Sequence, residues 1–463
     1  MQKELKKNFI FAFLAQGISL IVSCSTNLVL PKVLSVVNYS YWQLFIFYST
    51  YIPCLALGLN DGVYLRYGGI LRSKLDGNAV KSQFEVGIIF QTILGIVVGT
   101  VMILFSDSAN RQRVIFLVVV YYLFYTCHNF LGYIFQAINE TNIYSKSIII
   151  IRIVFLLSQI ILMWLGYREV YPYIVLYIVS IALALGYLLI RIHPEFHISQ
   201  FDINLGVRES LISMRVGISL MIANICSLLI LGVGRQIVDM KWGLVAFGKV
   251  SFSLTLMNFA LTFIMQIGLV LFPALRRLSS DELKGYYGKL TLGLFYILPL
   301  MYIVYLPVQY ILELWLPDYK GSISYLATVL PICYFDSKMN LIGNTFFKVL
   351  NKQVLLLKIN IITIVISSIF GLISAYIFNS MYFVIVGMVL AIIFRSVLAD
   401  TLLSKDIKTN VSALEVADVI LAIIFMFVSN SFDWRVALII ICALYILRIC
   451  LVKTKILKIK EFN

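Results

Sequence analysis

The sequence predicts an all-α polytopic membrane protein with about 14 transmembrane helices, and three observations lead to this prediction. Of the 463 residues, 61% are hydrophobic and 13% are charged, whereas a soluble domain is about half apolar and roughly a quarter charged. Runs of about 20 apolar residues recur along the chain, each long enough to cross a ~30 Å hydrocarbon layer as a helix. The alternating segments of roughly ten residues that a transmembrane β-barrel needs are missing from the sequence.

The hydrophobic runs divide the chain into fourteen expected spans joined by short loops. No loop is longer than about twenty residues, which leaves no room for a soluble domain. The spans are expected near residues 8–30, 41–66, 84–105, 113–137, 145–165, 172–191, 211–233, 244–275, 286–311, 323–349, 354–378, 382–403, 413–430 and 434–452.

The basic residues predict the orientation. Of the 37 Lys and Arg side chains, 23 fall on one side of the predicted membrane, eight fall on the other, and six lie within spans. Because short cytoplasmic loops carry the excess of basic residues, both termini are expected to be cytoplasmic. The net charge of +15 therefore belongs to the loops, and we expect no nucleic-acid partner.

Three matches predict an internal duplication, at offsets of 200, 210 and 211 residues. They are Gly17-Ile18-Ser19-Leu20 with Gly217-Ile218-Ser219-Leu220; Gly58-Leu59 and Leu65-Arg66 with Gly268-Leu269 and Leu275-Arg276; and Asn129, Gly132 and Phe135 with Asn340, Gly343 and Phe346. Six crossings return a chain to its starting side, so the two copies have the same orientation.

The duplication predicts two six-helix lobes around a central cavity. We expect an N-terminal lobe over 1–205 (spans 1–6), a C-terminal lobe over 206–408 (spans 7–12), and an appendage over 409–463 with spans 13 and 14 and a basic cytoplasmic tail. Such an arrangement is typical of transporters that work by alternating access.

Ionisable residues within spans are costly, so they should face a cavity or a partner. The stretch LALGLNDGVYLRYGG ends span 2 and contains Asn60, Asp61 and Arg66. A pair between Asp61 and Arg66 would need an irregular turn, which Gly58 and Gly62 would permit. The alternative is that Arg66 extends to lipid phosphates at the interface.

Other polar residues recur within spans 1, 4, 5, 10 and 12. Arg152 lies a third of the way into span 5, where it either faces a cavity or extends to the interface. The remaining candidates either line a cavity or bond neighbouring helices. They are Gln16 in span 1, Asn129 and Gln136 in span 4, the helical stripe Asp336, Asn340, Asn344 and Lys348 in span 10 with Lys338 beside it, and Arg395 in span 12. For Arg395 two alternatives stay open, a pair with Asp400 and a position in a cavity.

No sequence motif predicts an enzyme or a cofactor. The run His193-Pro194-Glu195-Phe196-His197 is the nearest to a metal signature, but its Pro disturbs the helix that would align the two His. There is no P-loop and no grouping of nucleophile, acid and base. The seven cysteines have no pairing pattern and are expected to be packing residues.

The duplicated lobes, the two extra C-terminal spans and the segment Gly58-Leu59-Asn60-Asp61-Gly62-Val63-Tyr64-Leu65-Arg66-Tyr67-Gly68-Gly69 resemble the Wzx-type polysaccharide flippases. These belong to the multidrug/oligosaccharidyl-lipid/polysaccharide exporter (MOP) superfamily. The resemblance implies that the chain moves undecaprenyl-diphosphate-linked oligosaccharide repeat units from the inner to the outer leaflet of the bacterial cytoplasmic membrane. Such units feed capsule, O-antigen or exopolysaccharide assembly, and the implied partners are this substrate, membrane lipids and other assembly proteins.

A cationic cavity suits such a substrate, because guanidinium and ammonium groups replace the hydration that a diphosphate would lose in the membrane. On this hypothesis Arg66 and Arg152 receive the diphosphate, and Asp61 either orients Arg66 or releases it by competing for the charge. The alternative is a cation-coupled drug or metabolite antiporter of the same superfamily, with binding carboxylates. Coupling to H⁺ or Na⁺ stays open at this stage.

Overall fold

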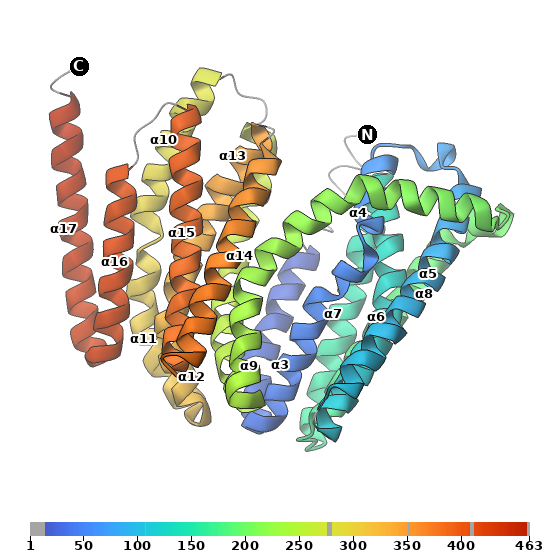
Figure 1. The fold of residues 1–463 in the computed structure, drawn as a ribbon, viewed down its shortest axis with the longest axis horizontal. Coiled ribbons are helices and arrows are strands. Elements are labelled where there is room, and N and C mark those ends of the chain that lie inside the picture. Colours follow the sequence, from blue (N-terminus) through green and yellow to red (C-terminus); the bar gives the residue numbers. More distant parts are fainter. Residues whose placement is uncertain (1–13, 107, 276–279, 351, 408–411, 461–463) are drawn as a thin grey trace. The chain divides into compact units, whose positions relative to one another are not determined.

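The computed structural model describes residues 14–106, 108–275, 280–350, 352–407 and 412–460 (Figure 1). Within these ranges the chain is 91% helical and contains no strand. The chain divides into two compact units, residues 1–225 and residues 226–463. The predicted fold class, an all-α polytopic membrane protein, is confirmed; the lobe boundaries at 205 and 408 stay a prediction.

Unit 1 contains the first part of the chain, up to the early turns of α9. A helical segment over Leu14–Val33 includes η1 (Ser25–Val29, a π-helix) and α2 (Leu30–Val33). It is followed by α3 (Val36–Tyr51), η2 (Ile52–Ala56), α4 (Leu59–Tyr67), η3 (Arg72–Lys74), α5 (Gly77–Leu104), α6 (Ala109–Ala137), α7 (Thr141–Trp164), α8 (Val170–Ile198) and the start of α9 (Ile203–Leu275).

Unit 2 contains the remainder of α9 and the helices that follow it. These are α10 (Ser280–Ile297), α11 (Leu300–Trp315), η4 (Pro317–Tyr319), α12 (Lys320–Lys338), η5 (Met339–Gly343, a π-helix), α13 (Asn344–Val349), α14 (Gln353–Tyr376), α15 (Met381–Ile407), α16 (Ser412–Ser431) and α17 (Trp434–Lys460).

Each of the fourteen predicted spans is mainly helical in its described part. Among the described residues, ten helices are long and apolar enough to cross a membrane, or eleven if the bent pair Val36–Ala56 and Leu59–Tyr67 is one span. Spans 7 and 8 lie in α9, where Gly243 has φ of +79° and breaks the helix between them. The Gly268-Leu269 and Leu275-Arg276 half of the predicted repeat lies outside the residues whose side chains the structure describes.

Side-chain caps mark several helix starts in unit 1. The hydroxyl of Ser35 accepts a hydrogen bond from the Asn38 N–H, and that of Ser108 accepts one from the Arg111 N–H. At the start of α5, the carboxylate of Asp76 accepts a hydrogen bond from the Ala79 N–H. Each cap satisfies one of the backbone donors that a helix start leaves without a partner.

Arg72, in the connection after α4, links this connection to the end of α8 and to the connection between α6 and α7. Its guanidinium bonds both Glu195 carboxylate oxygens at 2.5 and 2.9 Å, the Glu140 carboxylate at 2.8 Å, and the backbone oxygen of Arg191 at 2.6 Å. The hydrogen bonds with Glu195 raise the pKa of Arg72 above its ordinary value, with the charge of Glu140 adding to the shift. The network therefore stays ionised and holds the ends of α6 and α8 in place.

Helix α12 is the central element of unit 2, in contact with α11, α15 and α16. Its side chains are almost all buried, including Ile332, Tyr334 and Phe335. Helices α14 and α15 form an antiparallel pair beside it, and α17 packs on α11 and α16. The two C-terminal helices thus belong to the packed body of unit 2 (Figure 1).

Candidate functional site

Span 2 is broken where the unusual stretch begins. Leu57 and Gly58 both have left-handed backbone conformations, with φ of +48° and +82°, and the helix bends by 58° before α4 starts. A Cβ on Gly58 would lie 2.4 Å from the backbone nitrogen of Ile218, and one on Gly62 would lie 1.8 Å from the backbone oxygen of Ser213. The glycines therefore allow α4 and α9 to approach closely, rather than allowing Asp61 to reach Arg66.

Arg66 bonds across to α9 and not within its own helix. Its guanidinium contacts the Glu209 carboxylate at 2.5 Å, the Glu209 backbone oxygen at 3.0 Å and the Ser213 hydroxyl at 2.8 Å. From α5, the amide of Gln83 bonds the same two residues. The intrahelical pair with Asp61 is therefore replaced by an interhelical one, and the guanidinium is held by protein groups.

Asp61 and Asn60 have no such partners among the described residues. Asp61 is half-buried and lies within electrostatic range of the Tyr125 and Tyr133 hydroxyls. Asn60 is 4% exposed, and its side-chain oxygen accepts no hydrogen bond. The break in span 2 thus leaves two polar groups inside unit 1 with bonding capacity to spare.

Arg152 is half-buried in the middle of α7, and its Nε–H is buried without a hydrogen-bond acceptor. The hydroxyls of Tyr121 and Tyr144 lie within electrostatic range. No carboxylate among the described residues forms an ion pair with it. Unit 1 therefore contains a guanidinium in a membrane-spanning helix whose charge is not neutralised by any carboxylate of the described residues.

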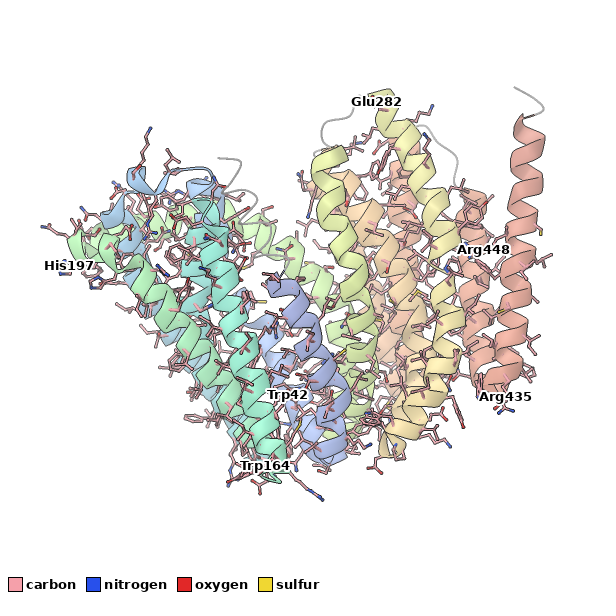
Figure 2. The ribbon with its side chains drawn as sticks, turned by 180° about the vertical axis from the view of Figure 1, so that it is seen from behind. Trp42, Trp164, His197, Glu282, Arg435 and Arg448 are labelled. Atoms are coloured by element: carbon pink, nitrogen blue, oxygen red, sulfur yellow. The ribbon has the colours of Figure 1, made fainter. Side chains whose placement is uncertain are left out.

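The residues near Arg152 on its own helix are packing residues. Phe155 stacks on Trp42 at a centroid distance of 5.8 Å (Trp42 is labelled in Figure 2). Gln159 is fully buried and bonds Thr26 and Ser25, which ties α7 to the first span. The face shared by Phe155 and Gln159 is thus a helix contact, and Arg152 lies at its edge.

The other unit 1 candidates make few bonds. Asn129 is 8% exposed, and Gln136 donates to the backbone oxygen of Gly132 on its own helix. Gln16 is half-buried on the first helix. No described residue joins Gln16, Asn129 and Gln136 into one hydrogen-bond network.

The predicted stripe on span 10 is the least buried side of that segment. Asp336, Asn340 and Asn344 are partly exposed and Lys348 is exposed, whereas most of their neighbours are buried. Asn344 donates to the Asn340 side-chain oxygen at 2.8 Å. The π-helix η5 contains Asn340, and such bulges often mark functional positions.

Arg395 pairs with the first residue of that stripe. Its guanidinium lies 3.2 Å from the Asp336 carboxylate, 2.9 Å from the Asn360 side-chain oxygen and 3.1 Å from the Ser227 hydroxyl. The sequence left two alternatives open for Arg395, and the one that paired it with Asp400 is wrong. Its carboxylate partner is Asp336. The fork of the guanidinium bridges three helices of unit 2.

Lys338 is buried and forms ion pairs with Asp400 at 2.7 Å and Asp418 at 3.4 Å. It has no pair with Asp336, two residues before it. Asp418 in turn pairs with Arg448 on α17. Sequence reasoning passed over Asp418 and Arg448, although a charge inside an apolar span was the signal that would have found both.

The charges of the two units therefore differ in what they can bind. In unit 2, Asp336 and Asp400 are each paired with a base of the protein. In unit 1, Arg152 keeps an uncompensated positive charge, and Arg66 shares Glu209 with Arg208. An arginine of this kind can bind an anion with planar, bidentate geometry, as carboxylates and phosphates have.

No protein-family model matches the chain, and no curated protein does. Solved structures do match its fold. The lipid II flippase MurJ, in an inward closed conformation, has 11% sequence identity and a TM-score of 0.67 over 97% of this chain and 99% of its own.

Two further structures match at similar identity. An inward-facing multidrug resistance MATE family transporter of the MOP superfamily is 12% identical, with a TM-score of 0.58 over 88% of this chain and 95% of its own. A MOP superfamily transporter from Pyrococcus furiosus is also 12% identical, with a TM-score of 0.54 over 89% and 96%. The chain therefore has the fold of the MOP superfamily transporters.

Proposed function

We propose that this protein is a flippase for lipid-linked oligosaccharides, which moves diphosphate-linked repeat units from the inner to the outer leaflet of the bacterial cytoplasmic membrane. The observation that carries the proposal is the environment of the Arg152 guanidinium. This half-buried guanidinium lies inside a helix that crosses the membrane, and among the described residues it has no carboxylate partner and no acceptor for its Nε–H. An uncompensated charge there is costly unless an anion joins it.

A diphosphate is an anion of the right chemistry. Its oxygens accept bidentate hydrogen bonds from a guanidinium, and the bonds are strong where water is scarce. Arg152 would receive the diphosphate first. Arg66 would join it by exchanging the Glu209 carboxylate for a phosphate, which is possible because Glu209 also bonds Arg208 at 3.2 Å.

Sugar hydroxyls both donate and accept hydrogen bonds, so side-chain amides and carboxylates are suitable partners for them. The proposed contacts are the amides and acids that the structure leaves partly exposed or with spare capacity. They are Asn60, Asp61, Gln16, Asn129, Gln136, Asp336, Asn340 and Asn344, with Lys338 and Arg395 holding the span 10 stripe in place from behind.

The extent of the structural likeness supports a lipid-linked substrate. The match with MurJ covers 97% of this chain, against 88% for the MATE transporter. The MurJ match therefore reaches most of the two C-terminal helices, and MurJ is named as a flippase of a lipid, lipid II.

Asp61 favours a second candidate, a cation-coupled drug or metabolite antiporter. Its half-buried carboxylate has no base beside it, because Arg66 bonds Glu209. A free carboxylate in a transporter helix suits a cationic drug, and several of the similar structures are multidrug transporters.

Deletion of the gene in its native host separates the two candidates. For the flippase we expect loss of cell-surface glycan together with accumulation of the complete lipid-linked repeat unit inside the cell. Unchanged glycan with new sensitivity to cationic drugs would establish the antiporter.

Complementation of that deletion with variants tests the residues. Arg152→Ala should abolish glycan display while the protein still reaches the membrane, and Arg152→Lys should restore only part of it, because Lys lacks the planar fork. Arg168→Ala is the matched control, because Arg168 is an exposed arginine in the connection between α7 and α8. Full display by Arg152→Ala would exclude the diphosphate role of this residue.

A further inference from the structure

Five ionisable side chains meet in the interior of unit 2, from four different helices. They are Lys338 on α12, Asp400 on α15, Glu415 and Asp418 on α16, and Arg448 on α17, and none is more than 7% exposed. Figure 2 labels Arg448 on the side of α17 that faces the rest of unit 2. We call this group the α16 cluster.

Ion pairs connect four of the five members. Lys338 contacts Asp400 at 2.7 Å and Asp418 at 3.4 Å, and Asp418 also contacts Arg448. Arg448 further lies over the Phe295 ring and 3.4 Å from the Tyr334 hydroxyl. The cluster therefore joins the two C-terminal helices to α12 and α15.

Glu415 is the member that forms no ion pair with the described residues, and one of its carboxylate oxygens is buried without a hydrogen bond. It is 5% exposed, and its Oε1 accepts no hydrogen bond from any described residue. The groups within electrostatic range of it are Lys338, Asp400 and Asp418, together with the Tyr287 hydroxyl of α10. The Tyr287 hydroxyl is itself buried without a hydrogen-bond partner among the described residues.

The charges in this cluster do not balance. Three carboxylates face two bases, which leaves one negative charge in excess when all five groups are ionised. The nearby pair Asp336 and Arg395 is neutral as a pair and does not correct the excess. A buried carboxylate without a partner costs several kcal/mol, and such a group is neutralised instead.

We propose that the α16 cluster is a proton-binding site, in which one exchangeable proton is held on the carboxylate of Glu415. The proton converts the carboxylate into a neutral carboxylic acid and removes the excess charge. A proton fits better than a metal cation because one oxygen is enough to hold it. A hard metal cation requires about six oxygen ligands and would be repelled by the adjacent Lys338 and Arg448 charges.

Binding of this proton also affects how unit 2 holds together. When the proton leaves, the excess negative charge lies where α16 contacts α12 and α15. The contact is then weakened by a buried ionised group, so the folded state loses stability as pH rises. This property is independent of the proposed flippase activity, since neither Arg152 nor Arg66 takes part in it.

Infrared difference spectroscopy of the purified full-length protein in lipid nanodiscs tests the site. A protonated buried carboxyl gives a C=O stretching band that shifts when H₂O is replaced by D₂O. We expect such a band near neutral pH, its loss at higher pH, and its absence near neutral pH in Glu415→Gln. Glu313→Gln is the matched control, because Glu313 is a helix carboxylate bonded by Gln309 at 3.0 Å, and it should keep the band.

Two further measurements complete the test. The wild type should melt at lower temperature as the band disappears, and Glu415→Gln should lose that pH dependence. If Glu415→Gln does not fold, Glu415→Asp should keep a carboxyl band at a shifted frequency. A band that persists unshifted in folded Glu415→Gln or Glu415→Asp would overturn the proposal. Displacement of the proton by Na⁺ at constant pH would also overturn it and would identify a metal-cation site.

Discussion

The guanidinium of Arg66 lies 2.5 Å from the carboxylate of Glu209, and this pair joins α4 to the start of α9. The two residues are 143 positions apart in the chain. Their pair lies directly beside the place where Gly62 meets the Ser213 backbone, so charge and close packing fix the same helix crossing.

The Arg66 pair should be measurable as a coupling energy. Glu209→Gln keeps the shape and removes the charge, so we expect unfolding free energy to fall by roughly 1–3 kcal/mol. In a double-mutant cycle with Arg66→Met the two losses should not add, because the residues share one contact. Thermal unfolding in detergent measures both. Glu85→Gln, a half-buried carboxylate on α5, serves as control and should change stability by no more than about 0.5 kcal/mol.

Gly62→Ala should separate α4 from α9. The new Cβ would lie 1.8 Å from the Ser213 backbone oxygen, and a backbone cannot move aside as a side chain can. We expect a loss of about 1–3 kcal/mol or more in thermal unfolding. Gly186→Ala is the control, since nothing lies within 4 Å of that Cβ and alanine favours helix. Equal stability of the two variants would contradict the close crossing.

The helices were predictable from sequence because the apolar runs are local. In each described span, the length and hydrophobicity of the run are enough to predict a helix, and the rest of the chain is not needed for that prediction. The break at Leu57 and Gly58 was not predictable in this way. It depends on Gly217 and Ser213 of α9, which the fold brings to within contact of α4.

For the charged candidates too, contacts between residues that are distant in the sequence could not be predicted. Sequence reasoning identified Asp336, Lys338 and Arg395 as residues that need partners, because a lone charge in a span is costly. It did not identify the partners. Lys338 and Asp418 are 80 positions apart, and Arg395 and Ser227 are 168 apart. Pairing over such separations is decided by helix packing.

Arg395→Met should destabilise unit 2 by leaving the Asp336 carboxylate without its base. We expect a loss of about 3–5 kcal/mol, typical of breaking a buried pair from one side. The double variant Arg395→Met with Asp336→Met should recover most of this loss in thermal unfolding, because no charge is left unpaired. If the double variant is no more stable than Arg395→Met alone, the loss comes mainly from the hydrogen bonds of Arg395 to Asn360 and Ser227, and not from the unpaired Asp336.

The distribution of basic residues predicts that the connection after α4 is cytoplasmic and that the one after α7 is external. Ser73 and Glu169 are exposed positions in these two connections. In a background with the exposed Cys24 and Cys450 changed to Ser, Glu169→Cys should react with a membrane-impermeant thiol reagent in intact cells. Ser73→Cys should react only after permeabilisation. The reverse result would place Arg72 and the start of α9 outside, where Arg66 could not take part in binding a substrate that arrives from the inner leaflet.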